Sequence, residues 1–179
     1  MVYAHGLDSD LLNWRSWQRG IGGYGNRFSH VDLLSQLVAG QDCPEHFVIL
    51  EDDIDLRSPA YVARVLRRLR RAMGILSADV AIMSGWDYMP KQVLPGQGFR
   101  FNPTSRCVCA LGKQFNLYTL NGAKRFLGAA DRHPGLHLDE AIARLQLAGD
   151  LLCIGLRRNP FSCFESRSDV AYADSSGDS

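Results

Sequence analysis

Three consecutive acidic residues stand at the end of a short apolar run in this sequence. The run is His46 to Leu50, and Glu51, Asp52 and Asp53 follow it directly. Because side chains alternate between the two faces of a strand, Glu51 and Asp53 are expected on one side and Asp52 on the other. Neighbouring carboxylates repel each other unless a cation lies between them, and their hard oxygen atoms suit Mg2+ or Mn2+. The pattern therefore predicts a metal site that can hold a diphosphate. The alternative is a solvated acidic turn or a helix N-terminus.

The apolar run is the strand that must position these acids. It is continuous and ends abruptly, which is typical of a buried parallel strand whose carboxyl end meets a cleft. Before it, a helix is predicted from about His30 to Ala39, with Ser29 as its N-cap. The apolar stripe of this helix consists of Val31, Leu33, Leu34, Leu37 and Val38. The stretch from Gly20 to Asn26 is predicted to be a loop, because ordering its glycines costs much backbone entropy.

Further helices and strands alternate along the rest of the chain. Beyond Pro59 an amphipathic surface helix is predicted, since apolar residues recur at helical spacing and arginines occupy mostly the other side. A loop is expected from Gly85 to Pro103, where glycine and proline are frequent. The other predicted strands are 80–84, 107–111, 115–119 and 151–156, and the other predicted helices are 121–130 and 138–147. The alternation predicts one α/β domain over residues 1–164 and a polar tail, 165–179, disordered towards its end.

Length and charge exclude several classes of protein. The chain has 179 residues, of which 46% are hydrophobic, enough for one domain with a sizeable core. Twenty Lys and Arg against 19 Asp and Glu leave a net charge of +1. No overall field therefore attracts nucleic acid or an anionic membrane, and any partner must be recognised by local chemistry. The sequence does not indicate an oligomeric state.

Cysteine usage and apolar runs bear on the compartment. The five cysteines lack paired C-x-x-C spacing, which favours free thiols over a disulfide framework or a structural zinc site. No apolar run approaches the roughly 20 residues that span a bilayer, so no transmembrane segment is predicted. The N-terminus has neither a basic start nor a long apolar stretch. A cytoplasmic location is therefore expected.

Several short motifs lie in order between residues 22 and 170. The segment 22–30 contains glycines and ends in Ser-His, and the acidic triplet begins 21 residues after His30. Segment 117–127 then combines a tyrosine, a hydroxyl residue, Gly-Ala and leucine, and segments 138–140 and 168–170 follow. Together these motifs resemble those of glycosyltransferase family 25. That family includes bacterial lipooligosaccharide galactosyltransferases and eukaryotic procollagen galactosyltransferases.

The resemblance implies a GT-A fold, an α/β sandwich that binds a nucleotide-sugar donor. The donor would be a UDP-sugar, with galactose as the sugar that the family favours, and the acceptor a glycan or another hydroxyl-bearing molecule. The resemblance also implies that Glu51 and Asp53 hold Mn2+ or Mg2+, with Asp52 beside them at the donor. Ser29 and His30 would help to shape the donor pocket, although helix capping alone would explain Ser29.

An inverting transfer is also implied by the resemblance. In such a transfer a carboxylate deprotonates the acceptor hydroxyl as that hydroxyl attacks the anomeric carbon. Asp139 and Glu140 are the candidates for this base, and the choice between them is open. Their alternative role is ordinary, because the helix dipole favours acids in the first turn of a helix.

Other functions compete with sugar transfer. The family usually begins with a strand that contributes to nucleotide binding, and no such strand precedes Ile21, so a GT-A-like fold without its first strand is expected. An inactive relative that acts as a binding module is therefore one alternative.

Asp53-Ile54-Asp55 has the D-x-D form of a haloacid dehalogenase-like phosphatase, yet Leu56-Arg57 follows where that chemistry needs threonine or valine. The arginines between 64 and 71 suggest a nucleic-acid-binding helix. An amphipathic helix must expose polar residues anyway, so no nucleic-acid partner is predicted.

Overall fold

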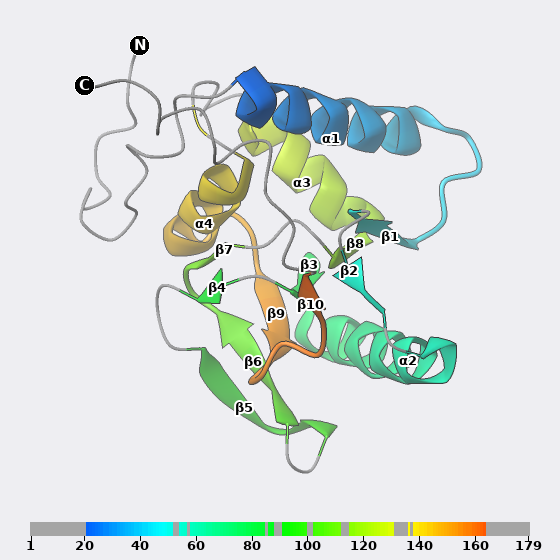
Figure 1. Cartoon of the computed structure of the whole chain (residues 1–179), viewed down its shortest axis with the longest axis vertical. Helices are drawn as coiled ribbons and strands as arrows, with labels where there is room; N and C mark the ends of the chain where they lie inside the picture. Colours follow the sequence, from blue (N-terminus) through cyan, green and yellow to red (C-terminus); the bar gives the residue numbers. More distant parts are fainter. Residues whose placement is uncertain are drawn as a thin grey trace, which may run out of the picture.

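The structure is a computed structural model that describes residues 21–51, 54–56, 58–84, 86–87, 91–99, 102–111, 115–130, 136 and 138–163. These residues form three layers, with a mixed β-sheet between two layers of helix (Figure 1). Helices α1 (Ile21–Ala39), α3 (Leu120–Ala130) and α4 (Leu138–Ala148) cover one face of the sheet, and α2 (Pro59–Leu76) covers the other. This mixed content confirms the predicted α/β class.

The main sheet has six strands in the order β1-β8-β3-β9-β6-β5. Only the β3–β9 pair is parallel, and the other neighbours are antiparallel. It follows that β1, β3 and β9 run in the same direction. The strands are β1 (His46–Leu50), β3 (Val80–Ile82), β5 (Gln92–Phe99), β6 (Asn102–Cys107), β8 (Phe115–Thr119) and β9 (Cys153–Leu156). Two small ladders join β2 (Ile54–Asp55) to β10 (Ser162–Cys163) and β4 (Trp86–Asp87) to β7 (Ala110–Leu111).

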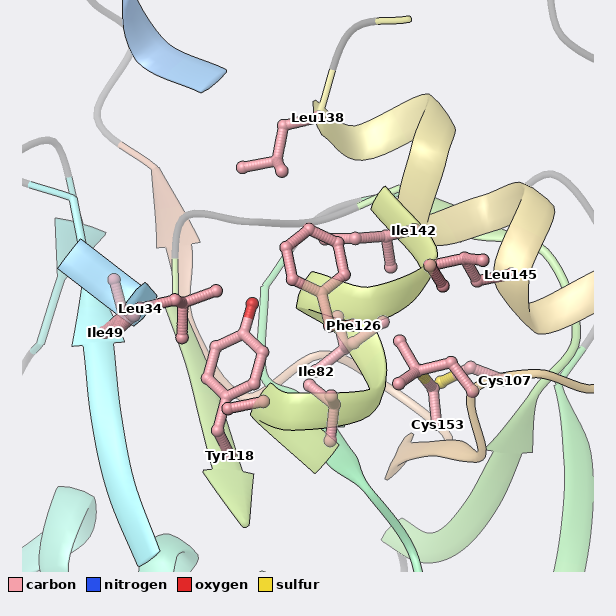
Figure 2. Packing of buried hydrophobic residues seen from close by; sticks show 14 of the residues in the cluster. Leu34, Ile49, Ile82, Cys107, Tyr118, Phe126, Leu138, Ile142, Leu145 and Cys153 are labelled. Atoms are coloured by element: carbon pink, nitrogen blue, oxygen red, sulfur yellow. The ribbon is translucent and has the colours of Figure 1, made fainter. Parts of the chain in front are cut away.

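Each face of the sheet carries its own hydrophobic cluster, because successive side chains of a strand point to opposite faces. On β3, Val80 and Ile82 belong to the cluster beneath α1, α3 and α4, whereas Ala81 belongs to the cluster beneath α2. Figure 2 shows the first cluster, which combines side chains of α1, α3 and α4 with Tyr118 of β8. The second cluster contains Val65, Leu69, Ala72 and Met73 of α2, packed on Ala81, Met83, Phe115, Leu117 and Ile154.

Helix α1 begins earlier than its sequence predicts. The predicted loop from Gly20 to Asn26 is wrong from Ile21 onwards, and Ser29 lies inside the helix instead of capping it. A glycine inside a helix costs about 1 kcal/mol relative to alanine, which weakens a helix without forbidding it. Tertiary packing offsets this cost, since Leu34 is fully buried and α1 packs against α3 and α4.

The strand at His46–Leu50 is confirmed, but its predicted parallel and buried setting is wrong. β1 is an edge strand, and it pairs antiparallel with β8. Phe47 and Ile49 are buried, whereas Leu50 is 48% exposed. β1, α2 and β3 do form a strand–helix–strand unit with both strands running in one direction. The pairing differs because β8, which comes much later in the chain, lies between β1 and β3.

The predicted loop from Gly85 to Pro103 is also wrong, since most of its described residues form β4, β5 and the start of β6. Glycine and proline are tolerated there because β5 is the outermost strand of the sheet. The β5–β6 register shifts between Val93 and Gly98, as at a β-bulge. Pro103 has no N–H group to offer, but its carbonyl accepts a hydrogen bond of 2.8 Å from the N–H of Arg157.

The helices predicted beyond Pro59, at 121–130 and at 138–147 are confirmed. α2 begins at Pro59, and the Ser58 hydroxyl accepts a hydrogen bond of 3.2 Å from the N–H of Tyr61. At α3 the Thr119 hydroxyl accepts one of 2.8 Å from the N–H of Gly122. The predicted helix 138–147 corresponds to α4. Among the strands, 80–84 and 115–119 are confirmed as β3 and β8, 151–156 is confirmed from Cys153 as β9, and 107–111 is interrupted between β6 and β7.

Two further predictions concern thiols and membranes. Cys43, Cys107, Cys109 and Cys153 are free, as predicted, and the last three are buried. Among the helices within the described ranges, none is long and apolar enough to cross a membrane. The predicted polar tail, 165–179, lies outside the described residues.

Candidate functional site

The acidic segment leaves the sheet at the end where β1, β3 and β9 all finish. Glu51 follows β1 directly and is partly buried. Ser84 follows β3 at the same end; it is fully buried, and its hydroxyl has no hydrogen-bond partner among the described residues. Asp52 and Asp53 lie outside the described residues, so of the predicted metal ligands Glu51 and Asp53 only Glu51 is described.

The chain is anchored on both sides of Asp52 and Asp53. Before them, β1 is held in the main sheet by β8. After them, β2 pairs with β10, and Ile54 is buried in the cluster that also contains Phe161. Within the described ranges, no group of three His, Cys, Asp or Glu side chains could hold a metal ion. A metal site at this end of the sheet would therefore need Asp52 or Asp53 in addition to Glu51.

A second group of polar side chains lies buried between the sheet and the helices. His30 of α1 is 6% exposed, and its Nε2 lies 3.1 Å from the hydroxyl oxygen of Tyr118 on β8, with which it shares a hydrogen bond. Figure 2 shows the Tyr118 hydroxyl pointing away from β8, between Leu34 of α1 and Phe126 of α3. The Tyr118 ring also stacks on Phe47 of β1, with ring centroids 5.8 Å apart. The tyrosine thus links an α1 histidine to the strand that precedes the acids.

The surroundings of Tyr118 keep its hydroxyl protonated. Complete burial raises the pKa of Tyr118 well above its ordinary value of 10.0, and the nearby Cys153 and Asp139 raise it further. A hydrogen bond with the Asn116 side chain lowers the pKa but does not outweigh burial. Asn116 is itself fully buried. A neutral phenol in this position acts as a hydrogen-bonding group that orients His30, and it is not available as a phenolate.

The two candidate bases, Asp139 and Glu140, both lie in the first turn of α4 and are both buried, at 2% and 4% exposure. Their surroundings differ. Glu140 accepts a hydrogen bond of 3.3 Å from the guanidinium of Arg144, one helical turn later. Burial raises the pKa of Glu140 above its ordinary value of 4.5, and the Arg144 charge opposes that rise. The other carboxylate oxygen of Glu140, Oε2, has no hydrogen-bond partner among the described residues.

Asp139 instead lies close enough to Tyr118 to affect its pKa. The structure therefore joins His30 to the buried Tyr118 by a hydrogen bond, places Asp139 near enough to raise the pKa of that tyrosine, and gives Glu140 an ion pair with Arg144. Ser29, the other predicted donor-pocket residue, is exposed on α1. Glu51 follows β1, whereas Ser29 and His30 lie on α1 and Asp139 lies on α4.

Sequence reasoning assigned no role to Tyr118, Asn116 or Arg144. The sequence does contain a signal for Asn116 and Tyr118. They are two residues apart in a mostly apolar strand, so their side chains share one face of the sheet. A buried asparagine needs hydrogen-bond partners, and alternation alone indicates a polar group on that face. Arg144 follows Glu140 by four residues, the spacing of an ion pair on a helix, but burial of that pair depends on tertiary packing.

No known protein family or relative identifies this chain. No family model matches the chain, and a search of curated proteins finds no relative. The resemblance to glycosyltransferase family 25 stays a prediction from motifs.

Proposed function

We propose that this protein is a glycosyltransferase with a GT-A-like fold that transfers a sugar from a UDP-sugar donor, with galactose as the first choice. The acceptor would be a glycan or another hydroxyl-bearing molecule. The observation that carries the proposal is the hydrogen bond between His30 of α1 and Tyr118 of β8. The two residues come from two of the motifs on which the resemblance rests, and motifs that serve one site must meet in the fold. Asp139, from a third motif, is near enough to raise the pKa of Tyr118.

The position of the acidic segment also supports the proposal. In open α/β sheets, ligands bind beyond the carboxyl ends of the strands. Glu51 follows β1 at such an end, where β3 and β9 also finish, and Asp52 and Asp53 come next in the sequence. In this proposal Glu51 and Asp53 hold Mn2+ or Mg2+, and Asp52 lies beside them at the donor. The cation would neutralise charge on the departing diphosphate.

The remaining residues take distinct roles in the proposed reaction. Asp139 is the preferred base, because Glu140 is occupied by its ion pair with Arg144. The neutral Tyr118 hydroxyl fixes the orientation of His30, which contributes to the donor pocket. Asp139 is only 2% exposed, so its role requires that the acceptor enter beside the first turn of α4 and displace part of its cover.

The donor site can be tested by calorimetric titration with UDP and with UDP-galactose, each with and without Mn2+. We expect binding that depends on the metal and is lost on addition of EDTA. Asp53→Asn should remove this binding. Asp55→Asn, which removes an equal charge two residues later in β2, is the matched control and should retain it. Absence of binding in every condition, or full binding by Asp53→Asn, would contradict the proposed site.

The choice of base needs a separate measurement of UDP release at saturating donor. Asp139→Asn should bind UDP-galactose and Mn2+ normally but lose turnover, because no carboxylate remains to accept the proton. Glu140→Gln should retain most of the turnover when it is assayed well below its melting temperature. Equal and small losses in the two variants would mean that neither residue is the base.

A further inference from the structure

Helix α2 carries five arginines on its solvent side. We call these residues the arginine ridge; they are Arg64, Arg67, Arg68, Arg70 and Arg71, and all five are exposed. The opposite side of α2 packs on the sheet through Val65, Leu69, Ala72 and Met73. α2 is the only described helix on its face of the sheet, so the ridge faces outwards with no helix beside it (Figure 1).

The charge of the arginine ridge is not balanced within the helix. Residues 59–76 contain no Asp or Glu, and the ridge accounts for five of the 20 basic residues of the chain. The remaining 15 basic residues stand against all 19 acidic residues. The net charge of the chain is therefore close to zero although α2 is strongly positive, because the rest of the sequence is slightly negative. A helix face that is merely solvated usually interleaves both signs of charge.

Four of the five arginines of the ridge are not neutralised by a described carboxylate. Arg64, Arg67, Arg70 and Arg71 form no salt bridge with a carboxylate of any other described residue. Arg64 packs on an aromatic ring, with its guanidinium 5.5 Å from the centre of the Tyr61 ring. Like charges four residues apart on a helix destabilise it slightly, as in the pair Arg67 and Arg71. A bound anion would remove this repulsion.

Three arginines of the ridge are aligned along the axis of α2. Arg64, Arg68 and Arg71 recur at intervals of four and three residues, so they lie in one line along α2. Ile75 continues the same line four residues later, and it is 57% exposed. At a rise of 1.5 Å per residue, the line from Arg64 to Ile75 is about 16 Å long. It presents guanidinium groups along its length and an aliphatic side chain at its end.

We propose that the arginine ridge docks the protein on a membrane surface that carries anionic lipid phosphates, with Ile75 in contact with the acyl boundary. Guanidinium groups bind phosphate oxygens in pairs of hydrogen bonds, and a straight row of them suits a planar layer of headgroups. The exposed Ile75 favours a lipid surface over a nucleic acid, because phosphate backbones offer no apolar phase for an aliphatic side chain. The contact is peripheral and does not depend on the proposed transferase activity.

The test is flotation of the full chain with vesicles of phosphatidylcholine alone and of phosphatidylcholine with phosphatidylglycerol. We expect binding to the anionic vesicles only, and release at high salt. Arg64→Gln with Arg71→Gln should weaken the partition by roughly fivefold per arginine, about 25-fold in all. Lys124→Gln with Arg157→Gln is the matched control. It removes the same charge from exposed residues elsewhere and should bind like the unaltered chain.

Three outcomes would overturn the proposal. The first is equal loss of binding in the two double variants, which would mean that net charge and not the ridge attracts the vesicles. The second is failure of the unaltered chain to bind anionic vesicles. The third is binding to duplex DNA or to RNA, measured by fluorescence anisotropy, that is tighter than vesicle binding and is lost in the ridge variant. That result would assign the ridge to nucleic acid. Ile75→Ser should weaken vesicle binding without changing its salt dependence, and no effect of this variant would remove the apolar contact from the proposal.

Discussion

Replacing Arg144 by methionine would leave the Glu140 carboxylate in the core without its counter-charge. Both side chains are 5% exposed, and their atoms approach to 3.3 Å. Removing one partner of a buried ion pair costs about 3–5 kcal/mol, because the other charge stays buried and uncompensated. For a chain of this size each kcal/mol lowers the melting temperature by roughly 2–4 °C. We therefore expect Arg144→Met to lower the melting temperature by about 6–12 °C at pH 7.5, taking the lower end of the energy range.

The loss should depend on pH in a definite direction. Burial raises the pKa of Glu140 above its value in the unfolded chain, so the folded state binds the proton more tightly. Such a group contributes stability that is present below the unfolded pKa of about 4.5 and is lost as the pH rises through the folded pKa. Without Arg144 the folded pKa rises further, so the deficit of Arg144→Met should shrink as the pH falls from 7.5 towards 5.

Urea denaturation followed by circular dichroism at both pH values measures this effect. Arg125→Met is the matched control, since Arg125 also pairs with a buried carboxylate, Asp79, at 3.3 Å but is itself 63% exposed. Exposed pairs contribute about 0–1 kcal/mol, so this control should lose little. Glu140→Gln combined with Arg144→Met should recover much of the stability. Equal losses in Arg144→Met and Arg125→Met, or a deficit that does not change with pH, would refute the reasoning.

Two further predictions concern packing. Gly122→Ala should destabilise the protein by about 2–4 kcal/mol, because the new Cβ would overlap the carbonyl oxygen of Asp79. Gly128→Ala on the same helix meets nothing within 4 Å and should stabilise the protein by about 0.5–1 kcal/mol. Thermal melting compares the two variants, and similar shifts in melting temperature would contradict the predicted overlap at Gly122. Gln146→Leu should cost about 1–3 kcal/mol in urea denaturation, because the Gln146 amide makes two hydrogen bonds of 2.9 Å to the backbone N–H and carbonyl of Ala110, both of which would lose their partner. An unchanged midpoint would show that water replaces the amide.

Elements with local signals could be predicted from the sequence, and pairings that depend on distant segments could not. The periodicity of α2 depends only on neighbouring residues, and the helix is observed. The direction and position of β1 depend on β8, which inserts between β1 and β3. A continuous apolar run does not encode that insertion. The extent of α1 likewise depends on packing against α3 and α4, which outweighs the preference of its glycines.

The candidate site divides in the same way. The types and spacing of Glu51 and Asp139 suggested chemistry, and local pattern places each of them beside an element that exists. Their surroundings are products of tertiary structure. The link from His30 to Tyr118 joins residues 88 positions apart, and the burial of Glu140 with Arg144 depends on what covers α4. No periodicity carries that information.

The order of strands in the sheet also has a consequence for synthesis of the chain. β3, in the middle of the sheet, is flanked by β8 and β9, so it lacks one neighbour until Thr119 and the other until Leu156 has been translated. Contacts between such distant segments form slowly. Until then the apolar side of α2 has no completed sheet to cover, and the nascent chain exposes it. We expect a ribosome-bound chain that ends before β9 to be protease-sensitive and to recruit chaperones, and protection to appear only once β9 has emerged.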